Sequence, residues 1–233
     1  MLKWATAGVI AALSCAAPAS AQVAATATLL SDHRFRGYSI SRERPVLDLT
    51  IAYDHASGGY ANGSLTGVWD GGSGPDFLSA SANVGYAKRL AGGPVVDVGL
   101  IHTEYTAQSS LERAAGYSEI YAGVIGRNVS SHVYFSPNYL RPGVETVYAD
   151  VQVFARPARS LRVSGHAGLL TRVAGPRDPY AADTQYDFPI SAARRLGPLD
   201  LHVAWTTAGP DRAYYGGRPR SRNGLVFGVS YTH

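Results

Sequence analysis

Two pairs of polar residues have the side chains and the spacing that acid–base or nucleophilic chemistry requires. His102 and Glu104 lie two residues apart, so on a β-strand they would share one face and could chelate a metal or act as an acid–base pair. Ser164 and His166 have the same spacing and offer the nucleophile and base of a lipid hydrolase. No third ligand lies near the first pair in sequence, and the strand pattern turns the second pair inward. We therefore predict no metal site, no cofactor and no enzymatic activity.

Other charged and histidine residues recur along the chain at positions that alternate with apolar ones. On strands, this alternation places them on the face opposite the apolar residues. If the strands close around a lumen, these side chains line it and set its ion preference, or they form cross-strand pairs that fill a narrow barrel. The pore-lining candidates are Asp48, Asp97, Glu119, Asp150, Arg162, His166, Asp200 and His202.

A basic cluster occupies the first predicted outer loop, from about residue 34 to residue 45. It contains Arg34, Arg36, Arg42 and Arg44. Guanidinium groups bind phosphates well, so the cluster could attract anions or bind lipopolysaccharide phosphates. A loop that is simply solvated is the plainer interpretation.

The elements that would position these residues are β-strands throughout. Residues 47–54 show the pattern most clearly, because Leu47, Leu49 and Ile51 alternate with polar residues and two acids lie on the opposite face. No segment after Gln22 keeps a helical period for more than two turns. Twelve alternating runs are predicted, at residues 23–30, 47–54, 60–69, 77–86, 95–105, 117–126, 132–136, 145–155, 161–170, 185–193, 199–207 and 225–231.

The connections between these runs alternate between short and mostly longer. That pattern is typical of an outer-membrane barrel, with tight periplasmic turns and longer outer loops. The sequence therefore predicts an all-β, single closed antiparallel transmembrane barrel of about 12 strands with both termini in the periplasm. Eight or ten strands stay open, since 132–136 is short and Pro189 interrupts 185–193. A soluble β-sandwich is the alternative, which the length of the strands and the recurring apolar face disfavour.

The first 21 residues read as a secretory signal peptide, which leaves residues 22–233 as the barrel. A positive start precedes an Ala-rich apolar run, and Ala19-Ser20-Ala21 provides a cleavage site before Gln22. A lipoprotein signal at Cys15 is a poorer match.

The composition excludes several other kinds of site. Cys15 is the only cysteine, so the exported chain can form neither disulfides nor thiolate zinc sites. The mild charge of +4 forms no basic block, so no nucleic-acid binding is predicted. Tyrosine outnumbers phenylalanine by 15 to 6, as expected at a membrane interface.

Residues 31–37, which read Ser-Asp-His-Arg-Phe-Arg-Gly, resemble the opening signature of the TorF-type porins of Gram-negative bacteria. Further blocks occur in the order of that family, at residues 53–61, 97–99, 119–123 and 136–139. The resemblance is strong over 31–70, moderate over 95–150 and weak in the last third. It implies an outer-membrane barrel that acts as a channel.

The C-terminal residues Gly228, Tyr231 and His233 resemble the signal read by the barrel-assembly machinery, although that signal usually ends in Phe or Trp. Together these features predict an outer-membrane porin-like channel for passive diffusion of small polar or ionic solutes. The predicted partners are membrane lipid, lipopolysaccharide and the assembly machinery. A structural or adhesive barrel with partner-binding loops and a membrane-embedded lipid-modifying enzyme stay open as alternatives.

Overall fold

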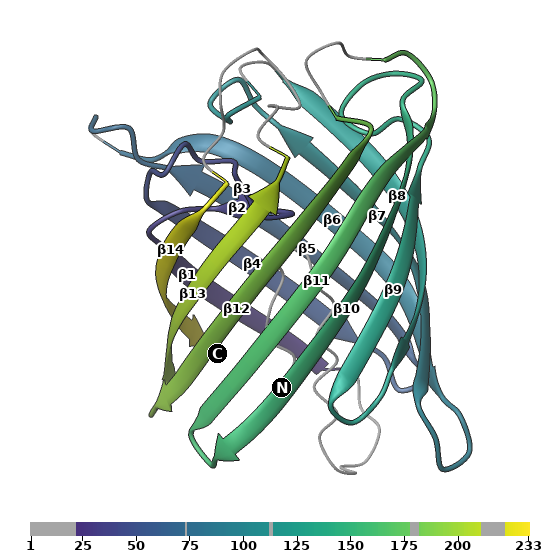
Figure 1. The fold of residues 1–233 in the computed structure, drawn as a ribbon. Coiled ribbons are helices and arrows are strands. Elements are labelled where there is room, and N and C mark those ends of the chain that lie inside the picture. Colours follow the sequence, from purple (N-terminus) through teal and green to yellow (C-terminus); the bar gives the residue numbers. More distant parts are fainter. Residues whose placement is uncertain (1–21, 73, 112–113, 178–181, 211–221) are drawn as a thin grey trace.

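The computed structural model describes residues 22–72, 74–111, 114–177, 182–210 and 222–233 (Figure 1). It is a closed antiparallel barrel of twelve strands, with one additional two-stranded hairpin. The barrel strands are β1 (Gln22–Leu30), β4 (Val46–Asp54), β5 (Gly59–Val68), β6 (Asp76–Arg89), β7 (Val95–Tyr105), β8 (Ala115–Ile125), β9 (Val129–Ser136), β10 (Glu145–Ala158), β11 (Leu161–Ala174), β12 (Thr184–Leu196), β13 (Leu199–Gly209) and β14 (Gly224–Thr232). The hairpin consists of β2 (Arg34–Phe35) and β3 (Tyr38–Ser39). The predicted fold class and the count of about 12 strands are confirmed.

The barrel closes where the first strand meets the last. β1 pairs antiparallel with β14 from Thr26↔Thr232 to Leu30↔Gly228, and with β4 on its other side. The Thr26 and Thr232 hydroxyls lie 3.0 Å apart across this seam, and the His233 amide donates to the Ala25 carbonyl. Because both neighbours of β1 are paired, the wall has no open edge at this point, which is the requirement for a barrel in lipid.

The two faces of the wall have opposite character. Outward side chains are apolar and exposed, such as Ile51 at 62%, Ile120 at 58% and Phe227 at 56%. Their strand neighbours point inward and are polar, such as Glu119 at 3% exposed. An apolar surface that surrounds the whole molecule is unstable in water and matches the hydrocarbon of a membrane.

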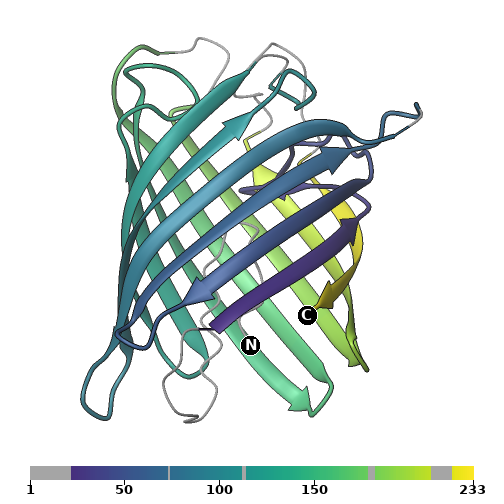
Figure 2. The ribbon, with the colours of Figure 1, turned by 180° about the vertical axis from the view of Figure 1, so that it is seen from behind.

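Connections of different length lie at the two ends of the barrel. Two-residue to five-residue turns join β4 to β5, β6 to β7, β8 to β9, β10 to β11 and β12 to β13, and longer connections lie at the other end (Figures 1 and 2). β1 begins beside the end of β4, at Gln22↔Asp54, so it begins at the end with the short turns. Within the described residues, no helix is long and apolar enough to cross a membrane.

Three local predictions need correction. Strict alternation over the predicted run 77–86 puts Leu78 on the outward face with Val84, but a β-bulge opposite Thr66 and Gly67 turns Leu78 fully inward and exposes Phe77 instead. Pro189 does not shorten β12, because the ladder with β11 omits Phe188 and Pro189 while the pairing with β13 continues. Tyrosines were expected mainly at the membrane interface, but a large group fills the interior, namely Tyr105, Tyr117, Tyr121, Tyr134, Tyr139 and Tyr148.

Candidate functional site: a basic hairpin across the lumen

The connection between β1 and β4 folds back into the barrel instead of projecting outward (Figure 1). Its centre is the β2–β3 hairpin, in which Phe35 pairs with Tyr38. The two turn residues, Arg36 and Gly37, have φ angles of 48° and 79°. Positive φ at both central residues is the signature of a tight two-residue hairpin turn, and an Xaa-Gly pair suits it.

The tip of this hairpin contacts the inner wall two and three strands away from β1. A Cβ added at Gly37 would lie 2.6 Å from the Ala208 Cβ and 2.9 Å from the Asp187 Cβ. These residues belong to β13 and β12, whereas the hairpin begins and ends at β1 and β4. Glycine is therefore needed at position 37 both for its φ angle and for the close contact with the wall.

Arg36 fixes the tip to the wall. Its Nη2 donates to both carboxylate oxygens of Glu119, at 2.7 and 2.9 Å, and both residues are buried. The guanidinium carbon lies 3.9 Å from the ring centre of Tyr148, with the rings of Phe35 and Tyr139 at 4.8 and 5.0 Å. One carboxylate and three aromatic faces thus surround one cation.

Burial opposes the charge on Arg36, but the Glu119 carboxylate and the surrounding tyrosines outweigh it and raise the pKa of Arg36 well above its usual value. The side chain therefore stays charged. A buried charge is stable only while its partner is present. Removal of one partner of such a pair lowers the free energy of unfolding by about 3–5 kcal/mol. The Arg36–Glu119 ion pair consequently holds the tip of the hairpin against β8.

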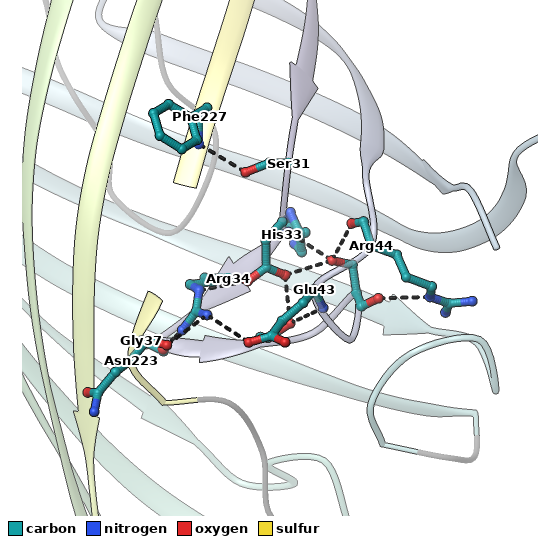
Figure 3. Close-up of polar contacts among 11 residues, drawn as sticks. Ser31, His33, Arg34, Gly37, Glu43, Arg44, Asn223 and Phe227 are labelled. Atoms are coloured by element: carbon teal, nitrogen blue, oxygen red, sulfur yellow. Dashed lines mark hydrogen bonds and ion pairs between the residues drawn. The ribbon is translucent and has the colours of Figure 1, made fainter. Parts of the chain in front are cut away.

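A polar network holds the base of the hairpin (Figure 3). Asp32 accepts hydrogen bonds from the Ser39 and Ser41 hydroxyls at 2.6 and 2.8 Å and pairs with the Arg34 guanidinium at 2.7 Å. Arg34 also donates to the Gly37 carbonyl at 3.0 Å, across the hairpin. Beside this network, the amide of Phe227 donates to the Ser31 hydroxyl at 3.0 Å, which joins the connection to β14 at the barrel seam.

The basic cluster is therefore not one solvated outer loop. Arg34 and Arg36 are directed into the barrel and ion-paired, which contradicts the plainer expectation. Arg42 and Arg44 lie nearer the rim and donate to the carbonyls of Ser109 and Gln108, at 2.9 and 2.7 Å. These two arginines link the first connection to the β7–β8 connection.

The predicted pore-lining acids lie on the inward face, but neighbouring side chains compensate their charge through hydrogen bonds and an ion pair. Asp48 accepts from Thr50 and Thr66 at 2.8 and 2.9 Å. Asp97 is fully buried and accepts from the Tyr60 hydroxyl at 2.7 Å. Asp200 is also buried, and its carboxylate lies 3.7 Å from the Arg195 guanidinium. These contacts favour a lumen that side chains have narrowed.

Histidines bridge acids elsewhere on the wall. His132 lies between Asp97 and Asp150, with nitrogen–oxygen distances of 3.5 and 3.7 Å. The predicted His166 contacts the Tyr148 hydroxyl at 2.9 Å and Asp187 at 3.0 Å. Arg162 and His202 lie on the same inward face as Asp200, because Ala193 on β12 pairs with Arg162 on one side and with His202 on the other.

A family model described as "Bacterial protein of unknown function (Gcw_chp)" matches residues 15–229. The chain belongs to the Gcw_chp family. No curated protein matches the sequence. The resemblance to the TorF-type porins is not confirmed by this match and stays a prediction.

The solved structures that this Gcw_chp barrel resembles include porins. The NanC porin aligns with a TM-score of 0.59 at 10% identity, over 90% of this chain and 99% of that one. The KdgM porin aligns with a TM-score of 0.52 at 9% identity, over 89% and 98%. KdgM in complex with disordered oligogalacturonate gives 0.51 at 9% identity, over 91% and 98%. At these identities the similarity shows the fold alone.

Sequence reasoning missed several partners in the Gcw_chp lumen. His132 was assigned only to the start of a short strand, and Asp187 lay in the run interrupted by Pro189. Nothing in the sequence indicates that an arginine 112 positions earlier packs on the ring of Tyr148. The available signal was alternation, which identifies a face but not a cross-barrel contact.

The two polar pairs with possible chemistry have different surroundings. Ser164 bonds to Ser191 at 2.7 Å on the inward face and His166 is occupied by Asp187, so they form no catalytic pair. His102 and Glu104 face outward, and His102 Nε2 lies 3.0 Å from Glu104 Oε1. Among the residues described, no group of three or more His, Cys, Asp or Glu could hold a metal ion.

Proposed function

We propose that this protein is an outer-membrane channel for passive diffusion of small polar or ionic solutes, with its narrowest point at the β2–β3 hairpin. A continuous apolar outer surface, a polar inner face and a closed seam support a barrel in lipid. The NanC and KdgM porins share the fold. The predicted signal peptide, residues 1–21, lies outside the described residues and would direct the chain to that membrane.

The main support for a constriction at the hairpin is the Arg36–Glu119 ion pair inside the barrel, at 2.7 Å. A loop that folds into a barrel and fastens to the opposite wall reduces the free cross-section there. A twelve-stranded barrel lies between the small filled barrels and the wide porins, so one inward hairpin decides how much of the lumen stays open.

We infer small solutes instead of long anionic chains. One similar porin, KdgM, was solved with an oligogalacturonate, which is an acidic sugar chain. Here the central arginine is neutralised by Glu119, and the nearby inward groups include the carboxylates of Asp97 and Asp150. Such a lumen offers little attraction to a polyanion.

The test is single-channel recording in planar lipid bilayers. We expect small conductance steps for the folded wild-type barrel, and larger steps when residues 34–39 are replaced by a flexible Gly-Ser linker. Arg36→Ala should raise the conductance in the same direction, since it releases the tip.

Arg172→Ala is the matched control. Arg172 is also ion-paired, to Asp183 at 2.7 Å, but this pair lies at the end of β11 next to the β11–β12 connection and involves no residue of the hairpin. Its conductance should equal that of the wild type. If neither the wild type nor the linker variant conducts, although heat-modifiable gel migration shows both to be folded, the channel proposal is wrong.

A further inference from the structure

Three polar side chains form a hydrogen-bonded line on the outer, lipid-facing side of the barrel. His102 Nδ1 lies 2.9 Å from the Ser118 hydroxyl, and His102 Nε2 lies 3.0 Å from Glu104 Oε1. His102 and Ser118 are direct cross-strand partners on β7 and β8. Cross-strand pairing thus supplies the serine that sequence spacing around His102 and Glu104 could not reveal.

The surroundings make this polar line unexpected. The preceding outward residues of β7 are Val96, Val98 and Leu100, and charged groups on a lipid-facing surface are costly, least so near the interfaces. About half of the His102 and Glu104 side chains are exposed, at 50% and 57%. Both lie within the last four residues of β7, close to the end with the longer connections, where ester groups of membrane lipids are found. Neither contributes to filling the lumen.

The contacts of His102 select one tautomer. If Nε2 carries the proton and donates to the Glu104 carboxylate, the Nδ1 lone pair accepts from the Ser118 hydroxyl. A serine, a histidine base and a carboxylate that orients the histidine are the parts of an activated nucleophile. Glu104 is held beside this site because Gly116, its cross-strand partner, has no side chain where the carboxyl group lies.

An apolar groove of about 680 Å³ ends at His102 and Glu104. It crosses the outer surface from Tyr231 on β14, and small residues such as Ala25, Gly63 and Ala82 form its floor. Five interstrand steps of about 4.8 Å give it a length of roughly 24 Å, which suits an extended acyl chain. The groove approaches His102 from the β6 side, whereas Ser118 lies on the other side, on β8.

We propose that Ser118, His102 and Glu104 form an esterase site for a membrane lipid with several ester-linked acyl chains. One chain would present its ester carbonyl to Ser118 while another chain of the same lipid lies in the groove. This activity is separate from conduction through the lumen and requires no cofactor.

The reaction balances with water as the only co-substrate. Ser118 Oγ attacks the acyl carbonyl carbon and transfers its proton to His102 Nδ1, and Glu104 stabilises the imidazolium. The bond from the carbonyl to the alkoxy oxygen then breaks, and the alcohol leaves with that proton. Water, deprotonated by His102, next hydrolyses the Ser118 ester and releases the fatty acid. Asn138, whose Oδ1 accepts from the Ser118 amide at 3.0 Å, brings its side-chain amide beside the nucleophile as the candidate donor to the oxyanion.

The first experiment uses the full barrel folded in vesicles and a fluorophosphonate probe, with the adduct located by mass spectrometry. We expect labelling at Ser118 in the wild type and its loss in Ser118→Ala. Labelling should fall about a thousandfold in His102→Ala and more than about tenfold in Glu104→Gln. Ser164→Ala is the matched control and should label like the wild type, because that serine faces the lumen. An unlabelled wild type, or a Ser118→Ala variant labelled to the same extent, would overturn the site.

The second experiment identifies the lipid. Fatty-acid release is measured from vesicles of glycerophospholipid alone and from vesicles that also contain lipopolysaccharide, and release that depends on Ser118 in either arm supports the site and assigns the source. No release in both arms would overturn the esterase. Ala82→Leu should lower release while leaving the small probe reactive; unchanged release would overturn the role given to the groove.

Discussion

Ser118, Glu119 and Ile120 are consecutive on β8 and experience three different environments. Glu119 is buried in the lumen against Arg36, Ile120 is directed toward lipid near the middle of the strand, and Ser118 lies on the outer face near the rim, bonded to His102. Since successive residues of a strand alternate between faces, one strand can contribute to two unrelated sites. Substitutions at neighbouring positions of β8 should therefore have separable effects on the position of the hairpin, on stability in the membrane or on the chemistry of the outer surface.

The lumen side should show the largest effect. Glu119→Ala leaves the Arg36 cation buried without its carboxylate, so we expect the free energy of unfolding to fall by about 3–5 kcal/mol. Urea titration of the barrel in lipid vesicles, followed by heat-modifiable migration, measures this. The double variant Arg36→Met with Glu119→Leu should recover most of the loss, because it removes both charges. Wild-type stability in Glu119→Ala would mean that the ion pair does not hold the hairpin.

The lipid side comes next. Ile120→Arg places a charge on the apolar outer face near the centre of β8 and should cost about 2–4 kcal/mol in the same vesicle titration. Ile120→Leu keeps the surface apolar and is the control, with little expected change. Equal stability of the two variants would show that this face does not lie in hydrocarbon.

The two faces of β8 could be predicted from sequence because alternation is a local property. Glu119, Tyr121 and Ile120 follow a period of two, and neither the predicted strand nor its orientation depends on distant residues. The same reasoning placed Asp97, Asp150 and Asp200 inward. It failed at Leu78, where a bulge inserts one residue and reverses the face for the residues beyond it.

The contacts between faces could not be predicted in this way. Arg36 meets a carboxylate 83 residues away, and the direction in which a loop folds depends on that partner more than on the composition of the loop. A basic, turn-rich segment such as 34–45 reads as solvated unless the glycine at its tip is recognised as a contact residue. Likewise, His102 and Glu104 lacked a third partner in sequence because Ser118 becomes their neighbour only once β7 and β8 pair in register.

The tip of the hairpin should show an intermediate effect. Gly37→Ala forces a side chain into the left-handed region at φ 79° and against Ala208, so we expect about 1–3 kcal/mol of destabilisation and a larger single-channel conductance. Gly71→Ala is a matched control: its φ is 94°, but nothing lies within 4 Å of the added Cβ. Backbone strain should destabilise Gly71→Ala as well, but its conductance should equal that of the wild type. Equal conductance of the two variants would show that the contact between Gly37 and the wall does not limit conductance.

The outer polar line should show the smallest effect on stability. Ser118→Ala removes one hydrogen bond to a half-exposed histidine, so its free energy of unfolding should change by less than about 0.5 kcal/mol and its conductance should not change. Measured beside Glu119→Ala, it tests whether adjacent residues of β8 act independently. A loss as large as that of Glu119→Ala would give Ser118 a structural role, because a catalytic hydroxyl on the surface contributes to the reaction and very little to the fold. Wild-type stability combined with lost probe labelling is the combination that only a chemical role for Ser118 explains.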